Sequence, residues 1–126
     1  MNGRRSDEEL DLAVKLGVYE LDQQRPGWED IVHLPTLQMS SECSCVLGQV
    51  FSTPLVRWGY YSGVQTLSGA PVNPDAEGYA DLDSAWAREH GFDASPDHDV
   101  AIDFRALQAR WSTVIRERQD AKRKAS

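Results

Sequence analysis

Apolar residues recur every three or four positions over much of this chain, and this spacing predicts helices. The clearest helix start is a capping box, in which Ser6 is the N-cap and Glu9 stands at the third helical position. Pro26-Gly27 ends this helix, and Gly17 in its middle leaves room for a close contact with another helix. The apolar stripe consists of Leu10, Val14, Val18 and Leu21, flanked by Leu12, Ala13 and Leu16.

Three more helices are expected outside the cysteine-containing block described next. A short one covers residues 28–34, and a longer one covers about 79–90. Gly91 fits the left-handed position after that longer helix, with Phe92 folding back on its last turn. The last helix has Asp103 as its expected N-cap. Its buried stripe consists of Phe104, Leu107, Trp111, Val114 and Ile115.

The block Cys43–Phe51 holds both cysteines and predicts a further helix, capped by Ser40-Ser41. In a helix, residues two apart point roughly 200° away from each other, so Cys43 and Cys45 could not hold one ion together. Only an extended chain would place both thiols on one side. The favoured interpretation is that at least one cysteine is a small buried hydrophobe. A metal site made by Cys43, Cys45 and His33, or a redox role, is the alternative.

Glycine and proline are dense in residues 52–78, which predicts a long ordered loop or a very short β-hairpin and no helix. The hairpin strands would be Leu55–Tyr61 and Val64–Leu67. An aromatic group with a neighbouring arginine lies in this segment, and such residues are enriched at interface hot spots. The same residues could instead pack over a small helical core and cover it. The candidate partner-binding residues are Arg57, Trp58, Tyr60 and Tyr61.

The expected fold is therefore mainly α, with four to five helices around one core. A chain of 126 residues is one domain by length and can bury a real core. We expect the helical domain to span residues 1–118 and residues 119–126 to form a basic, frayed tail, because the apolar face ends near Arg118.

The chain is acidic, with a net charge of −7, which argues against direct binding to nucleic acid or to an anionic membrane. Residues 116–126 carry +3, so the remainder carries −10. No N-terminal apolar run or spanning segment is visible, and the two cysteines make a poor disulfide framework. The expected location is a reducing cytoplasm.

Catalytic motifs are missing from the sequence: it has no phosphate loop, nucleophile elbow or HExxH. A thiol catalyst made by Cys45 and His33 would need a lowered cysteine pKa, and the apolar neighbours oppose it. An acidic group near the start of the last helix could bind a cation, although such residues are ordinary turn formers and caps. The group is Asp93, Asp97, His98, Asp99 and Asp103. The sequence favours a non-enzyme without a cofactor.

The run Cys-Val-Leu-Gly-Gln, followed by an aromatic residue, resembles an uncharacterised family of small actinobacterial and actinobacteriophage proteins. The matching residues are Trp28, Leu34, Leu37, Ser40-Ser41, Cys45–Phe51, Gly91-Phe92-Asp93 and Trp111. The resemblance implies a phage or actinobacterial setting and no catalytic residues.

These observations together favour a non-catalytic protein–protein interaction module, expected to be a phage accessory protein that acts on a host or phage protein. Two alternatives stay open. One is a small metal-binding protein that uses the cysteines and a histidine. The other is an acidic decoy that occupies the surface of a nucleic-acid-binding protein.

Overall fold

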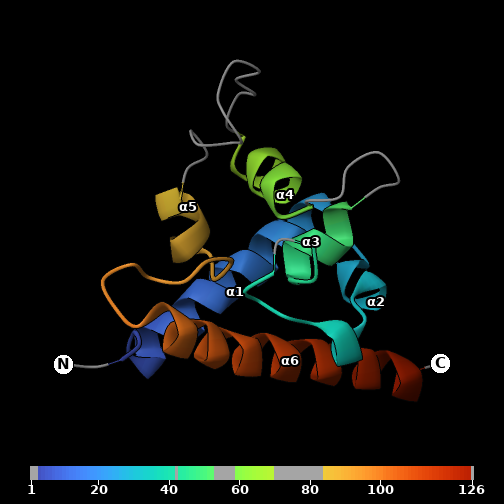
Figure 1. Cartoon of the computed structure of the whole chain (residues 1–126). Helices are drawn as coiled ribbons and strands as arrows, with labels where there is room; N and C mark the ends of the chain where they lie inside the picture. The colour runs from blue at the N-terminus through green and yellow to red at the C-terminus, as the bar shows by residue number, and fades with distance from the viewer. Residues whose placement is uncertain (1–2, 42, 53–58, 70–83, 126) are drawn as a thin grey trace.

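Helices account for the regular structure of this chain in a computed structural model that describes residues 3–41, 43–52, 59–69 and 84–125 (Figure 1). These residues form six α-helices and one 3-10 helix, and none of them is in a strand. The mainly-α class is confirmed, with more helices than the four or five expected. The elements are α1 (Asp7–Gln24), α2 (Trp28–Ile31), η1 (Leu34–Thr36), α3 (Val46–Phe51), α4 (Gly59–Ser68), α5 (Ser84–Glu89) and α6 (Val100–Ala125).

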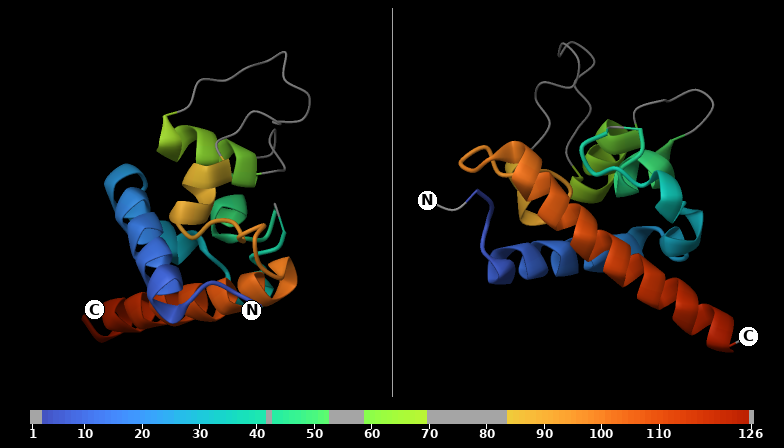
Figure 2. Two further views of the ribbon diagram at one scale, coloured as in Figure 1. Left: turned by 90° about the vertical axis from the view of Figure 1, so that its left-hand side faces the viewer. Right: turned by 60° about the horizontal axis from the view of Figure 1, so that its bottom comes forward.

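Helix α1 begins as the sequence predicts. The Ser6 side chain accepts a hydrogen bond from the Glu9 backbone N–H, and the Glu9 carboxylate accepts one from the Ser6 N–H. The helix crosses α6 and also contacts α4 and α5. Figure 2 (left) shows α1 along one edge of the molecule, beside α6 and α5. Its inward face is made of Leu10, Ala13, Val14, Gly17 and Leu21.

One core joins the helices, and three aromatic rings dominate it. Trp28 and Trp111 meet edge to face with ring centroids 5.8 Å apart, and Phe92 stacks on Trp111 at 5.4 Å. Both indoles are satisfied, because Trp28 Nε1 donates to Asp22 and Trp111 Nε1 donates to the carbonyl oxygen of Gly91. Rings of this size supply a large share of the apolar area that a small domain buries.

Two local predictions about glycine are confirmed. Gly17 is buried, and a Cβ at this position would lie 2.2 Å from the carbonyl oxygen of His90 and 3.0 Å from the Trp111 ring. Gly91 has φ +75° after the end of α5, and Phe92 N–H donates to the carbonyl of Ala87. This is a Schellman ending, which requires a residue that tolerates the left-handed region.

The predicted loop over residues 52–78 is wrong for residues 59–68, which form α4. The glycines that suggested breaks instead allow α3 and α4 to approach closely. A Cβ on Gly59 would lie 2.5 Å from the Gly48 carbonyl oxygen, and one on Gly63 would lie 2.8 Å from the Phe51 ring. The predicted strand Val64–Leu67 is wrong, because these residues belong to α4. The predicted strand Leu55–Tyr61 is wrong for residues 59–61, and its earlier part lies outside the described residues.

Two predicted helix starts are also wrong. Helix α3 begins at Val46, and its N-cap is Cys45, whose sulfur accepts from the Gly48 N–H at 3.2 Å. Helix α6 begins at Val100, and the carboxylate that caps it belongs to Asp99. Asp103 lies inside the first turns of α6 and is fully buried.

The remaining helix predictions hold in part. Helix α2 and η1 together replace the single helix expected over 28–34. Helix α5 covers 84–89 of the helix expected over 79–90, and residues 79–83 lie outside the described part of the chain. Helix α6 continues to Ala125, with Gln119 donating to the Glu29 carbonyl oxygen at 2.8 Å. Whether its last residues fray stays a prediction.

Candidate functional site

The predicted aromatic patch can be placed at one residue. Tyr60 on α4 is half-buried, packs against the core, and its hydroxyl donates to Asp93 Oδ2 at 3.2 Å. Burial raises the pKa of Asp93, while the hydrogen bonds from Ala94 and Tyr60 act in the opposite direction. Arg57 and Trp58 lie outside the described residues, as does the side chain of Tyr61. Tyr60 therefore helps to join α4 to the segment after α5.

The cysteines have different environments. Cys45 is 1% exposed, and burial raises the pKa of its thiol to about 12 despite hydrogen bonds from backbone N–H groups. Cys43 is exposed, and so is His33, whose Nδ1 lies 3.2 Å from the Thr36 hydroxyl. The prediction of a buried cysteine is confirmed for Cys45. In the described ranges, no group of three or more His, Cys, Asp or Glu residues is arranged to hold a metal ion.

The Cys-Val-Leu-Gly-Gln run has a structural explanation at each position. Cys45 caps α3, Val46 and Leu47 are fully buried, and Gly48 packs against α4. The Gln49 amide donates to the Ser44 carbonyl oxygen at 3.0 Å and accepts from the His33 N–H at 2.6 Å. Gln49 thus holds the segment before α3 against the segment after α2. Sequence reasoning missed this role because both partners are backbone groups.

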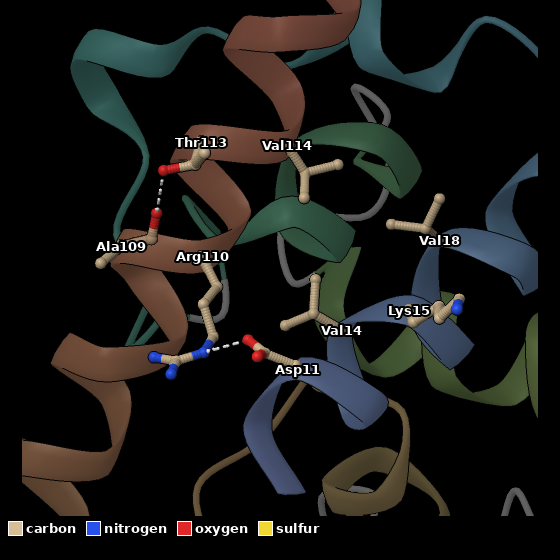
Figure 3. A pocket seen from close by; sticks show the side chains of 8 residues that line it. All are labelled: Asp11, Val14, Lys15, Val18, Ala109, Arg110, Thr113 and Val114. Atoms are coloured by element: carbon tan, nitrogen blue, oxygen red, sulfur yellow. Dashed lines mark hydrogen bonds and ion pairs between the residues drawn. The ribbon is translucent and has the colours of Figure 1, made fainter. Parts of the chain in front are cut away.

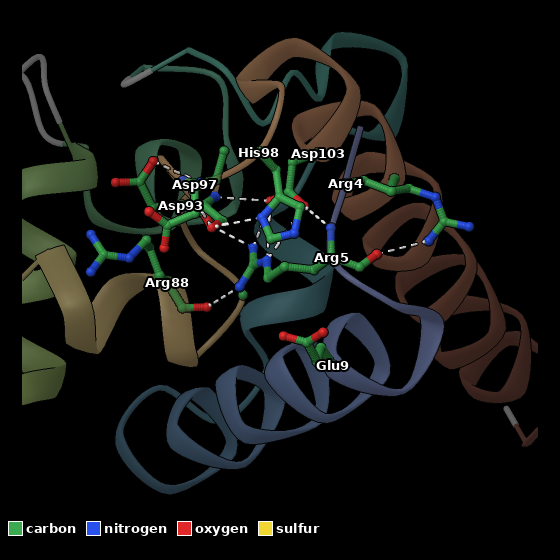
Figure 4. Close-up of polar contacts among 12 residues, drawn as sticks. Arg4, Arg5, Glu9, Arg88, Asp93, Asp97, His98 and Asp103 are labelled. Carbon is green, nitrogen blue, oxygen red and sulfur yellow. Dashed lines mark hydrogen bonds and ion pairs between the residues drawn. The ribbon is translucent and has the colours of Figure 1, made fainter. Parts of the chain in front are cut away.

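A buried polar network includes part of the acidic group for which cation binding was the alternative to turn formation and capping (Figure 4). The Asp103 carboxylate accepts from the guanidinium and backbone N–H of Arg5, and also from the Ser95 N–H at 3.0 Å. Arg5 also donates to the carbonyl oxygens of Arg88 and Asp93. The carboxylate that a cation would need is therefore already neutralised by a guanidinium, and the network fastens the N-terminus to α5 and α6.

The outward face of α1 carries large apolar side chains. Leu12 is 57% exposed, Leu16 is 38% exposed and Tyr19 is 59% exposed. Their spacing of four and three residues places them on one side of the helix, opposite the buried face. We call these three residues the α1 stripe. The sequence analysis noted both leucines only as neighbours of the buried stripe.

A groove runs beside the α1 stripe, between α1 and α5, with a volume of about 440 Å³. Leu12, Ala13 and Leu16 form its apolar wall. Glu9, Arg88 and Glu89 line it as charged residues, with Arg5 and Ser95 completing it. The α1 stripe is therefore continuous with a concave surface, a shape that side chains of another molecule could enter.

A second groove lies on the other side of α1, against α6, with a volume of about 430 Å³ (Figure 3). Val14, Val18 and Val114 line its apolar part. An ion pair between Arg110 Nε and Asp11 Oδ1, 2.8 Å apart, crosses from one helix to the other. This groove is a seam between two packed helices, in which Asp11 and Arg110 already pair with each other and Lys15 is the remaining charged residue.

Helix α1 is strongly acidic. Its sequence contains six acidic residues and one lysine, a net charge of −5. Three of its aspartates, Asp7, Asp11 and Asp22, form ion pairs with arginines of α6. Glu8 and, on α5, Glu89 have no ion pair among the described residues. Negative charge without an ion pair therefore lies at the start of the α1 stripe and in its groove, and Lys15, three residues after Leu12, adds an exposed positive charge on that side of the helix.

Comparisons of the chain with protein-family models, with curated proteins and with solved structures give no match. None of the helices in the described part of the chain combines the length and apolar character that crossing a membrane requires.

Proposed function

We propose that this protein is a non-catalytic protein–protein interaction module and that the α1 stripe is its main contact surface. The observation that carries the proposal is the exposure of Leu12, Leu16 and Tyr19 on one side of a helix whose other side is buried. Grouped apolar side chains on a surface mark interaction sites, and tyrosine is enriched among residues that dominate binding energy.

The buried polar groups support a non-catalytic role. Arg5 and Asp103 form hydrogen bonds with each other and with three backbone groups of other residues. Both side chains are therefore engaged within the fold and are not positioned to act on a substrate. Cys45, with a pKa near 12, is protonated at neutral pH and its sulfur caps α3. A nucleophilic cysteine requires the opposite shift, towards the thiolate.

The resemblance of the Cys45–Phe51 run adds the biological setting to this proposal. We propose that the protein is a phage accessory protein that acts on a host or phage protein in the cytoplasm of an actinobacterial cell. The aromatic residues Trp58 and Tyr61, with Arg57, stay candidates for a second contact area.

The test is affinity capture with the purified chain as bait in an actinobacterial host lysate. The key variant replaces Leu12 and Leu16 with glutamine, which has nearly the helix propensity of leucine. Ile31→Gln is the matched control, since Ile31 is 55% exposed but lies on α2, outside both grooves. We expect the double variant to lose at least about tenfold of the partner signal, equivalent to roughly 1.4 kcal/mol, and the control to retain it.

A Trp58→Ala, Tyr60→Ala variant separates the two candidate surfaces in the same experiment. Loss of the partner with this variant alone would move the contact away from α1. Equal enrichment by all variants, or no partner enriched over bead controls, would remove the support for an interaction module.

A further inference from the structure

We propose that the partner presents a basic amphipathic helix, which packs lengthwise on α1 and inserts its apolar side chains between the α1 stripe and α5. This inference rests on the proposed function and names the chemistry of the partner. Three observations support it: the spacing of the α1 stripe, the groove beside it, and the sign of the charges around both.

The spacing of the α1 stripe matches a helical occupant. Leu12, Leu16 and Tyr19 follow the alternating steps of four and three residues that form the seam between two packed helices. Helix α1 has 18 residues, so it offers a surface about 27 Å long. A partner helix of about five turns would cover that length. An extended strand would instead need an open sheet edge to pair with.

The groove gives the partner side chains a place to enter. Leu12 and Leu16 stand on the wall that faces α5, and the volume of about 440 Å³ exceeds that of a single aliphatic side chain. Helix-in-groove recognition buries anchors at every third or fourth residue in such a hollow. Tyr19, further along α1, would contact the next turn of the same partner helix.

The charges around the α1 stripe and its groove indicate whether the partner is basic or acidic. Glu8 lies one turn before Leu12 on the same face, and Glu9 and Glu89 line the groove. Two cations share this surface: Lys15 is exposed three residues after Leu12, and Arg88 lines the groove, where its charge opposes the burial that raises the pKa of Asp93. Arg5 also lines the groove but is paired with Asp103, so the three carboxylates outnumber the remaining cations. Helix α1 carries −5 by sequence, and Asp7, Asp11 and Asp22 within this total are paired with arginines of α6. Lysine or arginine residues flanking the apolar anchors of a partner would be attracted to this surface.

A second copy of this chain does not fit the same requirements. Pairing α1 with another α1 would bring together two acidic chains, each with a net charge of −7 and with Glu8 at the contact surface. The basic end of α6 carries Lys122, Arg123 and Lys124, but between Gln119 and Ala125 its apolar residues are only alanines. Such a segment has the right charge and lacks side chains that could fill the groove. The occupant is therefore a different protein.

Synthetic peptides test the inference directly. The main probe is a fluorescein-labelled amphipathic helix of about 18 residues, with leucines along one face and lysines elsewhere, a length that matches α1. Two matched peptides serve as controls: one scrambles the same residues so that no apolar face forms, and the other replaces each lysine with glutamate. Fluorescence anisotropy measures each dissociation constant. We expect both control peptides to bind at least about tenfold more weakly.

Protein variants locate the binding surface. Leu12→Gln with Leu16→Gln should weaken the basic amphipathic peptide about tenfold, whereas Ile31→Gln should leave binding unchanged. Glu8→Gln with Glu89→Gln should weaken it about threefold and reduce its dependence on salt. Ala121→Lys adds positive charge at an exposed position near the end of α6 and serves as the charge control. Circular dichroism checks that each variant is folded.

Each contrary result has a definite meaning. Equal binding of the scrambled peptide would show that charge alone is recognised, as an acidic decoy requires, and would overturn the inference. Equal binding of the glutamate peptide would overturn the proposal that the partner helix is basic. A dimer in sedimentation velocity that the leucine double variant dissolves would make a second copy the occupant. If the basic peptide fails to bind while capture from lysate still depends on Leu12 and Leu16, this inference falls and the proposed function stands. If neither depends on those leucines, both fall.

Discussion

Arg5 and Asp103 form a buried ion pair between residues 98 positions apart, with Nη2 and Oδ2 separated by 2.9 Å. The pair joins the residue before the first helix turn to the first turns of α6. Arg5 also donates to the carbonyl oxygens of Arg88 and Asp93, and Asp103 accepts from the N–H of Ser95. A closed network of this kind specifies how the two ends of the chain meet.

Replacement of Asp103 by asparagine should be strongly destabilising, because it leaves the Arg5 guanidinium buried without a counter-charge. We expect a loss of about 3–5 kcal/mol in the free energy of unfolding, measured by urea denaturation and circular dichroism. Asp97→Asn is the control, since Asp97 is an exposed residue of the same loop region and should change stability by less than about 0.5 kcal/mol. Similar stabilities for the two variants would show that the ion pair contributes little.

Lowering the pH should remove the contribution of the Asp103 carboxylate to the free energy of unfolding. Burial acts to raise the pKa of Asp103, but the hydrogen bonds from Arg5 and Ser95 outweigh it and hold the pKa below the ordinary value of 3.8. A depressed folded-state pKa stabilises the fold above pH 3.8, and this contribution is lost as the pH falls through that value towards the lower folded pKa. The stability difference between wild type and Asp103→Asn should therefore shrink between neutral pH and about pH 3. A difference that stays constant would argue against a charged Asp103 in the folded protein.

Gly17→Ala should destabilise the protein although alanine is the better helix former. The gain in helix propensity is about 1 kcal/mol. The new Cβ would lie 2.2 Å from the His90 carbonyl oxygen, so α1 and the end of α5 would have to move apart. We expect a net loss of about 1–3 kcal/mol by thermal or urea unfolding. Gln23→Ala, at an exposed position of the same helix, should be neutral or slightly stabilising. Equal free energies of unfolding for the two variants would mean that α1 and the end of α5 can move apart at little cost.

The two cysteines should differ sharply in alkylation. Under native conditions near pH 8, iodoacetamide should modify the exposed Cys43 and leave Cys45 unmodified, because Cys45 is buried and its pKa is about 12. Peptide mapping by mass spectrometry measures both sites, and denaturant should expose Cys45. Cys43→Ser should abolish native labelling. Rapid modification of Cys45 in the folded protein would revive the reactive-cysteine alternative.

Local signals in the sequence were reliable where neighbours along the chain decide the structure. The capping box at Ser6 and the left-handed Gly91 were both predicted, because each depends on hydrogen bonds within a few residues. The prediction failed at Gly59 and Gly63, where glycine serves contact with α3 and not a turn. It also failed at Asp103, whose carboxylate binds a residue near the other end of the chain.

The candidate site illustrates the same division. Two pairs of residues in α1 have helical spacing: Leu10 with Val14, and Leu12 with Leu16. Periodicity alone could therefore support either face of the helix as the buried one. The predicted patch around Trp58 was chosen by residue type. The exposed leucines were overlooked because an exposed leucine is recognised only when the rest of the fold is known.

Amino-acid order alone determined the helical class, the start of α1 and the end of α5, since helix propensity and capping act over one or two turns. The tertiary structure decided which stripe of α1 faces water, which glycines mark close contacts, and that Asp103 is a buried partner of Arg5. These outcomes depend on burial and on charge pairing between distant segments, and such energies exist only after the segments have packed together.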